Sequence, residues 1–285
     1  MEHTEVFRPW DADDIEYEAM LTAREMLPDH VRPAVMDWLD RALRQFNGND
    51  SIHLIQTSLH VDLELDTNLF YDASEVLDAV VERGDRFLIR TIDLLLATQN
   101  SLYESYNAAL TLDMYLSRGA SSIAVTESDE GPYRITRRLP DGVEQVASTA
   151  TETANEAAGR HLASAWRAAT AFDADASKAM VEAIRAVEAA AGPVITPKEQ
   201  PPRLGKIVAA LKDSPRWRLT LQSRDDGHPD HRLVLIGMLE TLAFAQRDRH
   251  GGEPAAPVEA MGHVQLASTL VSWFSTGVVT RETSA

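Results

Sequence analysis

Apolar residues recur at helical spacing along almost the whole chain, and this periodicity constrains the fold more than any other feature. From Ser74 to Gly119 one apolar stripe follows another in steps of three and four residues, and the pattern resumes after Thr151 and continues to Phe274. Such steps place apolar side chains on one face of a helix. The sequence therefore predicts a mainly α fold.

The helical pattern breaks between Ser122 and Val146. Two short runs rich in β-branched residues flank the turn-forming sequence Asp-Glu-Gly-Pro at 129–132, which is typical of a β-hairpin. A second turn signal, Pro-Asp-Gly, follows at 140–142. We expect a small ribbon of two or three strands that divides the chain into three parts: an acidic N-terminal helical module (1–120), a β-ribbon junction (121–149) and a C-terminal helical bundle (150–285).

The helices of the bundle can be outlined from the same periodicity. An alanine-rich helix is expected over about 151–171, and a second helix ends at Ala191, before the stop signal Gly192-Pro193. A short helix follows near Leu204, after a Pro-Pro break. The segment 233–245 is apolar nearly all round, which predicts a central helix of the bundle.

Residues 52–66 fit two structures. Leu59, Val61, Leu63 and Leu65 alternate with polar residues, which is typical of a strand. The helical patterns on both sides favour a helix instead, and the sequence leaves both interpretations open.

Charge is distributed unevenly along the chain. Residues 1–149 hold 28 Asp and Glu against 12 Arg and no Lys, whereas residues 150–285 hold 16 acidic against 15 basic residues. Within the second half, residues 198–224 carry seven cations and two anions. The acidic half repels nucleic acid, while the 198–224 segment can attract a phosphate backbone. An ordinary solvated surface is the alternative explanation of this clustering.

Several classes of protein are disfavoured by composition and by absent motifs. The chain has no cysteine, which excludes disulfides and thiolate metal sites. No apolar run approaches the roughly 20 residues of a membrane span, and the acidic first residues are unlike a signal peptide. Phosphate-binding glycine loops, a nucleophile elbow and a His-Glu-x-x-His metal motif are missing. We expect a cytoplasmic protein without a membrane segment, a metal or a cofactor.

The segment from Gln246 to Gly252 combines anion-binding and acid–base groups. Arg247, Arg249 and His250 fall within four residues at the end of an apolar helix. An Arg can neutralise charge on a phosphoryl oxygen, and a His can exchange a proton near neutral pH. Together these groups are sufficient for metal-independent cleavage of RNA by its own 2′-hydroxyl, with two such pairs around one phosphate in a two-fold dimer. Alternatively, the cations simply complement the negative end of a helix dipole.

Five short segments of the second half resemble a known family when they are taken together. They are residues 175–179, 186–189, 204–207, 247–252 and 267–274. With these segments and the apolar helix between them, residues 150–275 resemble the C-terminal helical domain of abortive-infection proteins, which belongs to the HEPN superfamily (higher eukaryotes and prokaryotes nucleotide-binding).

The resemblance implies a helical bundle, often dimeric, that acts in toxin or phage-defence systems. Active members cleave RNA without a metal through an Arg and a His separated by four to six residues. Only two residues separate Arg247 from His250 here, although a three-residue step still keeps both on one helix face. The candidate site residues are Arg247 and His250 for catalysis, Arg249, Lys206 and Arg203 for RNA or phosphate binding, and Asp248 and Glu188 as supporting partners.

Three functions are therefore open at the level of sequence. The leading one is an abortive-infection, phage-defence type of protein whose bundle binds RNA or nucleotide and acts as a metal-independent endoribonuclease, as a homodimer through the bundle. The alternative is a non-enzymatic helical module for dimerisation or protein interaction, with a protein partner on the acidic N-terminal module. In the third, the acidic half covers the basic 198–224 segment and restrains its activity.

Overall fold

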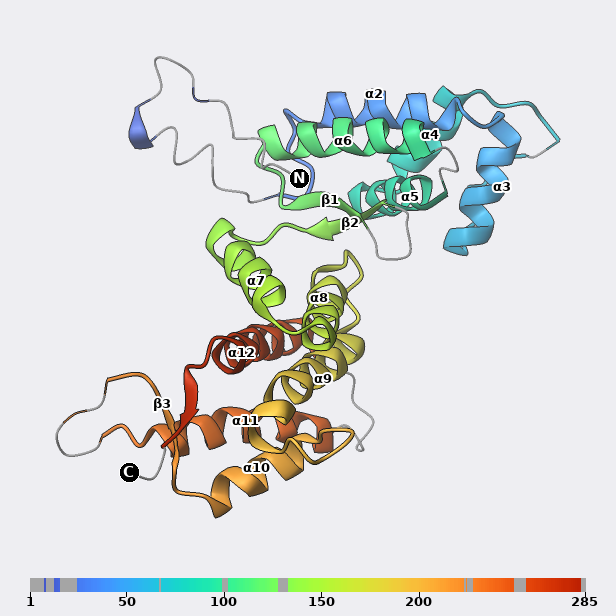
Figure 1. The fold of residues 1–285 in the computed structure, drawn as a ribbon. Helices are drawn as coiled ribbons and strands as arrows, with labels where there is room; N and C mark the ends of the chain where they lie inside the picture. Colours follow the sequence, from blue (N-terminus) through green and yellow to red (C-terminus); the bar gives the residue numbers. More distant parts are fainter. Residues whose placement is uncertain are drawn as a thin grey trace. The chain divides into compact units, whose positions relative to one another are not determined.

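A computed structural model describes most of the chain (Figure 1). The described residues are 8, 13–15, 25–66, 68–98, 102–127, 133–222, 224, 228–248 and 255–282, and the side chains of 102–106, 141 and 245–248 lie outside this description. The fold is mainly α with a small antiparallel hairpin, as predicted. Two compact units, Met1–Arg138 and Leu139–Ala285, make up the chain. Their boundary falls inside the segment 121–149 that was expected to form a junction.

The first unit consists of helices and one β-hairpin. Its elements are α2 (Arg32–Leu43), α3 (Gly48–Leu59), α4 (Ala73–Glu82), α5 (Asp85–Thr98), α6 (Leu102–Arg118), β1 (Ile123–Glu127) and β2 (Tyr133–Arg137). The ambiguous residues 52–66 are helical up to Leu59 and then form a loop, in which His60 and Glu64 have positive φ. The helical alternative is therefore right for the first half of that segment, and the structure has no strand in the second half.

Two carboxylates fix the hairpin to the helices of the first unit. Asp93 of α5 accepts a hydrogen bond from the Ile135 amide at 2.8 Å and pairs with Arg134 at 2.7 Å. Asp113 of α6 accepts one from the Val125 amide at 2.9 Å. These bonds satisfy edge amides that a two-stranded sheet otherwise leaves open. The hairpin thus belongs to the first unit.

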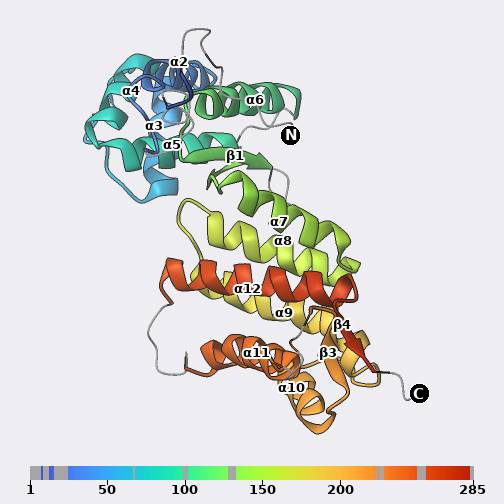
Figure 2. The same ribbon diagram turned by 90° about the vertical axis from the view of Figure 1, so that its left-hand side faces the viewer.

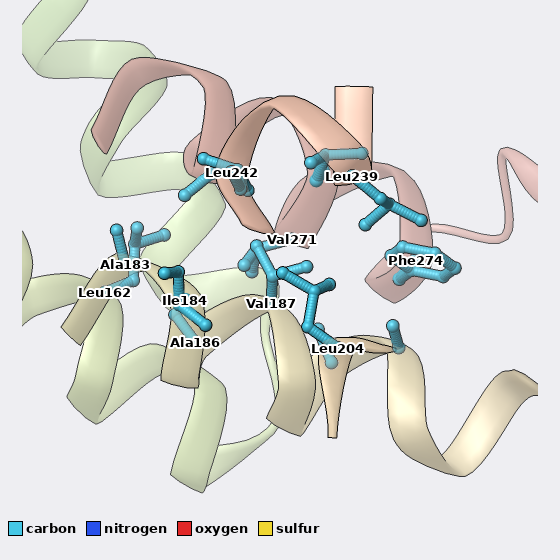
Figure 3. Close-up of a cluster of buried hydrophobic side chains, with 14 of the residues drawn as sticks. Leu162, Ala183, Ile184, Ala186, Val187, Leu204, Leu239, Leu242, Val271 and Phe274 are labelled. Carbon is cyan, nitrogen blue, oxygen red and sulfur yellow. The ribbon is translucent and has the colours of Figure 1, made fainter. Parts of the chain in front are cut away.

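The second unit is a helical bundle with a second, very small sheet. Its elements are α7 (Asp141–Thr153), α8 (Glu156–Thr170), α9 (Ala176–Ile195), α10 (Leu204–Asp213), β3 (Trp217–Leu219), α11 (His231–Asp248), α12 (Pro257–Ser275) and β4 (Val279–Arg281). In Figure 2, α8, α9 and α12 run side by side, α7 lies against α8 and α12, and α10 and α11 lie beyond α9. The buried side chains labelled in Figure 3 come from α8, α9, α10, α11 and α12, so one core joins these helices.

Part of the expected ribbon is a helix. Residues 141–153 form the helix α7. The turn signal Pro-Asp-Gly at 140–142 had predicted a turn within the ribbon at this place. Pro140 precedes the first turn, where a missing amide proton costs nothing. Ala147 and Ala150 are buried at a three-residue spacing against the bundle core. The apolar stripe therefore decides the structure, and the three-stranded form of the ribbon is wrong, as is the single helix expected over 151–171.

Helix α9 continues past Pro193, which had been expected to stop it. A proline at this position leaves the carbonyl four residues earlier, that of Ala189, without an amide partner. The Asn155 side chain supplies the missing donor, with Nδ2 3.0 Å from the Ala189 carbonyl oxygen. Asn155 also caps α8, because its Oδ1 accepts the Ala158 amide at 3.0 Å. One side chain thus separates α7 from α8 and allows α9 to reach Ile195.

Helix α11 is peripheral, although its apolar composition predicted a central helix. Leu235, Leu239 and Leu242 are fully buried, but Leu233 and Phe244 on the opposite side are 57% and 61% exposed. One face of α11 therefore has no covering element among the described residues of this unit. The pairing of β3 with β4 was also not anticipated, because it joins segments about 60 residues apart through three residues each.

No helix among the described residues is long and apolar enough to cross a membrane.

A double-mutant cycle tests the role of Asn155. Asn155→Ala removes a cap and a carbonyl partner and is expected to lower the free energy of unfolding by about 2 kcal/mol in urea denaturation. Pro193→Ala restores an amide that can bond to Ala189, so in the Asn155→Ala background it should return about 1 kcal/mol. Strictly additive effects of the two substitutions would contradict this account.

Candidate functional site

A cavity of about 800 Å³ lies in the second unit among α9, α10 and α11. This size is within the range of sites for small molecules and cofactors. Its apolar wall comes mainly from Leu204, Val208, Ala209 and Ala243. Its charged groups are Glu188 from α9; Arg203, Lys206 and Lys212 from the start and the length of α10; and Glu240 from α11.

The end of α9 packs closely against the residues that precede α10, next to this cavity. A Cβ atom on Gly192 would lie 2.5 Å from the side chain of Pro202, so only glycine permits this approach. One turn earlier on α9, Glu188 Oε1 accepts the Leu204 amide at 2.7 Å. Glu188 therefore caps the first turn of α10, whose N-cap residue, Arg203, makes no capping bond with its own side chain.

Burial raises the pKa of Glu188, because a half-buried carboxylate loses hydration. The Leu204 amide and the positive charges of Arg185, Arg203 and protonated His161 act in the opposite direction and do not cancel this effect. Glu188 thus keeps a proton to higher pH than an ordinary glutamate.

The cations of the cavity differ in their pairing. Lys212 forms an ion pair with Glu240, and both side chains are about half exposed. Arg203 and Lys206 are exposed and form no side-chain hydrogen bond or ion pair with another described residue. Gly205 lies between them and has open space where a Cβ atom would stand. Two cations without a side-chain partner among the described residues thus lie on either side of Gly205 in the wall of the cavity.

A second polar cluster lies on the same helix α9. The His161 Nδ1 atom of α8 is 2.6 Å from Glu182 Oε2, and Arg185 Nη1 is 2.7 Å from Glu182 Oε1. Burial alone would raise the pKa of Glu182, but His161 and Arg185 outweigh it and lower the pKa. The Glu182–Arg185 contact follows from their three-residue spacing, whereas the partner 21 residues away could not be found from the sequence.

The structure brings together three of the seven predicted site residues. Arg203, Lys206 and Glu188 line one cavity, with Glu188 bonded to α10. Arg247 and Asp248 are the last residues of α11, and their side chains lie outside the described part of the chain. Arg249 and His250 lie outside the described residues altogether. Lys212 and Glu240 were not predicted as site residues; the basic character of 198–224 was the available signal for Lys212.

The end of α11 nonetheless has a definite relation to the cavity. Position 247 follows Glu240 by seven residues and Ala243 by four, so it shares their helix face. Seven residues correspond to roughly 10 Å along the helix axis. The same length along a nucleic-acid strand corresponds to about three nucleotides.

Comparison with protein-family models, curated proteins and solved structures finds no match for this chain. Among the described residues, no group of His, Asp and Glu side chains has an arrangement suited to a metal ion.

The opposite pKa shifts of Glu188 and Glu182 predict opposite pH dependences of stability. The pKa of Glu188 is higher in the folded than in the unfolded protein, where it is about 4.3. Glu188 therefore contributes its full stability below about pH 4.3, and this contribution is lost as the pH rises through its folded-state pKa. A variant without the Glu188 carboxyl should therefore gain free energy of unfolding relative to wild type as the pH rises. For Glu182, with a lowered folded pKa, the contribution is present above about pH 4.3 and is lost as pH falls.

Urea denaturation of Glu188→Gln and Glu182→Gln between about pH 3 and 7 measures both effects. Relative to wild type, Glu188→Gln should gain stability with rising pH, and Glu182→Gln should lose it. Differences of the same sign for both variants would show that burial does not control the titration of Glu188.

Proposed function

We propose that the C-terminal unit binds a phosphate-bearing ligand, RNA or a nucleotide, in the cavity among α9, α10 and α11. The observation that carries this proposal is a pair of exposed cations, Arg203 and Lys206, which line a cavity large enough for a nucleotide and have no side-chain partner among the described residues. Guanidinium and ammonium groups bind phosphate through charge-assisted hydrogen bonds. The apolar wall of the cavity can accept a nucleobase or a ribose edge.

The proposal extends to RNA cleavage through the end of α11. Arg247 and His250 would supply charge neutralisation and proton transfer, as the resemblance to abortive-infection proteins of the HEPN type implies. The position of residue 247 supports this extension, since it is roughly 10 Å along the helix from a residue that lines the cavity. In this role the protein acts in the cytoplasm in phage defence, and its toxicity depends on RNA cleavage.

A non-enzymatic interaction module is the second candidate, and one observation favours it. The exposed face of α11 carries Leu233, Val234 and Phe244, which are 57%, 40% and 61% exposed. An exposed apolar stripe of this kind is typical of a contact surface. The occupant proposed for it is a second copy of the chain, which would give a homodimer through the bundle.

Substitutions separate binding from cleavage. Arg203→Ala/Lys206→Ala should weaken binding of a short single-stranded RNA and lower the slope of log affinity against log salt by about 1.4, since two phosphate contacts are lost. Lys198→Ala is the matched control, because Lys198 is an exposed cation that does not line the cavity. Arg247→Ala and His250→Ala should retain RNA binding and abolish cleavage and the growth arrest that expression causes.

Two results would contradict these expectations. An unchanged salt slope in Arg203→Ala/Lys206→Ala would remove the cavity as the binding site. If Arg247→Ala and His250→Ala stay as toxic as the parent, the cleavage mechanism fails. A protein that cleaves no RNA at any salt, and whose oligomeric state changes with Phe244→Glu, would favour the interaction module instead.

A further inference from the structure

A carboxylate without an ion-pair partner among the described residues lines the same cavity as Arg203 and Lys206. Glu188 lines the cavity and uses one oxygen, Oε1, to accept the Leu204 amide at 2.7 Å. Its other oxygen, Oε2, forms no hydrogen bond with a described residue and is not sealed from solvent. An anionic ligand held by Arg203 and Lys206 therefore meets a second anion in the same cavity.

The groups around Glu188 define the electrostatics of this encounter. They are His161 of α8, Glu182 and Arg185 of α9, Arg203, Lys206 and Lys212 at the start and along α10, and Glu240 of α11. Of these, Glu182 is paired with His161 and Arg185, and Glu240 with Lys212. Arg203, Lys206 and the Glu188 carboxylate have no ion-pair partner among the described residues. A proton on Glu188, or shared with it, therefore raises the net positive charge available to a ligand by one unit.

The two kinds of phosphate differ in their ability to supply such a proton. A phosphate monoester has a second pKa of about 6, so near that pH it carries one P–OH group that can donate a hydrogen bond. A phosphodiester carries one negative charge and no dissociable proton. A P–OH group facing a carboxylate oxygen forms a short, strong O–H···O⁻ bond, whereas a diester in the same place brings two anions together.

We propose that the cavity selects a terminal phosphate monoester, such as that of a nucleotide or of a phosphorylated RNA end, over an internal phosphodiester, and that Glu188 determines this specificity. In the complex, Arg203 and Lys206 bind the ionised phosphate oxygens, and the P–OH group donates to Glu188 Oε2. The Leu204 amide keeps Oε1 in place, so the carboxylate is already oriented before the ligand arrives. This inference rests on the proposed function, since it specifies the ligand of the same cavity.

Matched ligands test the inference on the full chain. AMP and its methyl ester differ only in the proton that a methyl group replaces. At about pH 6, calorimetric titration should show the wild type binding AMP at least about tenfold more tightly than the ester, as one hydrogen bond to a charged group provides. Glu188→Gln should bring this ratio below about threefold, chiefly by strengthening binding of the ester.

Controls distinguish the failure of this inference from the failure of the proposed function. Glu240→Gln removes the other carboxylate of the cavity and should leave the preference for AMP intact. At about pH 8, where free AMP has lost its second proton, AMP binding to the wild type should take up about one proton, measured in buffers of different ionisation enthalpy. Glu188→Gln should take up markedly less.

Each remaining outcome is decisive. Equal affinity of the wild type for AMP and its ester, or an unchanged preference in Glu188→Gln, overturns the selection of monoesters and leaves phosphate binding standing. If the wild type binds neither ligand, the proposed function fails and the inference fails with it. The comparison of AMP with its ester uses the wild type alone. It therefore tests the inference even if the Glu188→Gln variant does not fold.

Discussion

The hydrogen bond from Asn155 to the Ala189 carbonyl is the interaction on which the candidate site depends. Without a donor at this carbonyl, Pro193 would kink or end α9 within its last two turns. These turns carry Gly192 against Pro202 and keep Glu188 opposite the first turn of α10. A single amide at the boundary between α7 and α8 therefore positions the cations of a helix about 50 residues further along the chain.

In the proposed phosphate site, an acidic residue beside the cations has a use of its own. An ionised carboxylate beside two cations weakens general attraction for phosphate, which would be a disadvantage for indiscriminate binding. The same carboxylate favours a ligand that brings its own proton. Burial raises the pKa of Glu188 and the Leu204 amide lowers it, and the effect of burial is the larger. We therefore assign affinity and selectivity in the proposed site to different residues: Arg203 and Lys206 provide the affinity, and Glu188 provides the selectivity.

Local patterns in the sequence predicted much of the fold, and long-range contacts account for what they did not. The helical stripes anticipated α10 and α12, and the turn at 129–132 anticipated the hairpin. The continuation of α9 could not be anticipated, because the donor that compensates for Pro193 lies 34 residues upstream. The exposure of α11 was equally hidden, since an all-round apolar helix does not reveal which of its faces has a neighbour. For the site, composition indicated Arg203 and Lys206, but their convergence with Glu188 depends on the packing of α9 against α10. Arg247, Arg249 and His250 stay predictions.

We propose that phosphate binds at the start of α10, beside Glu188. Nuclear magnetic resonance of protein labelled with ¹⁵N at leucine and glycine measures this most directly, during a titration with AMP. We expect saturable shifts of the Leu204 and Gly205 amide signals that exceed those of leucines and glycines in the first unit. Absence of any shift at Leu204 and Gly205 at AMP concentrations that saturate binding would contradict the account.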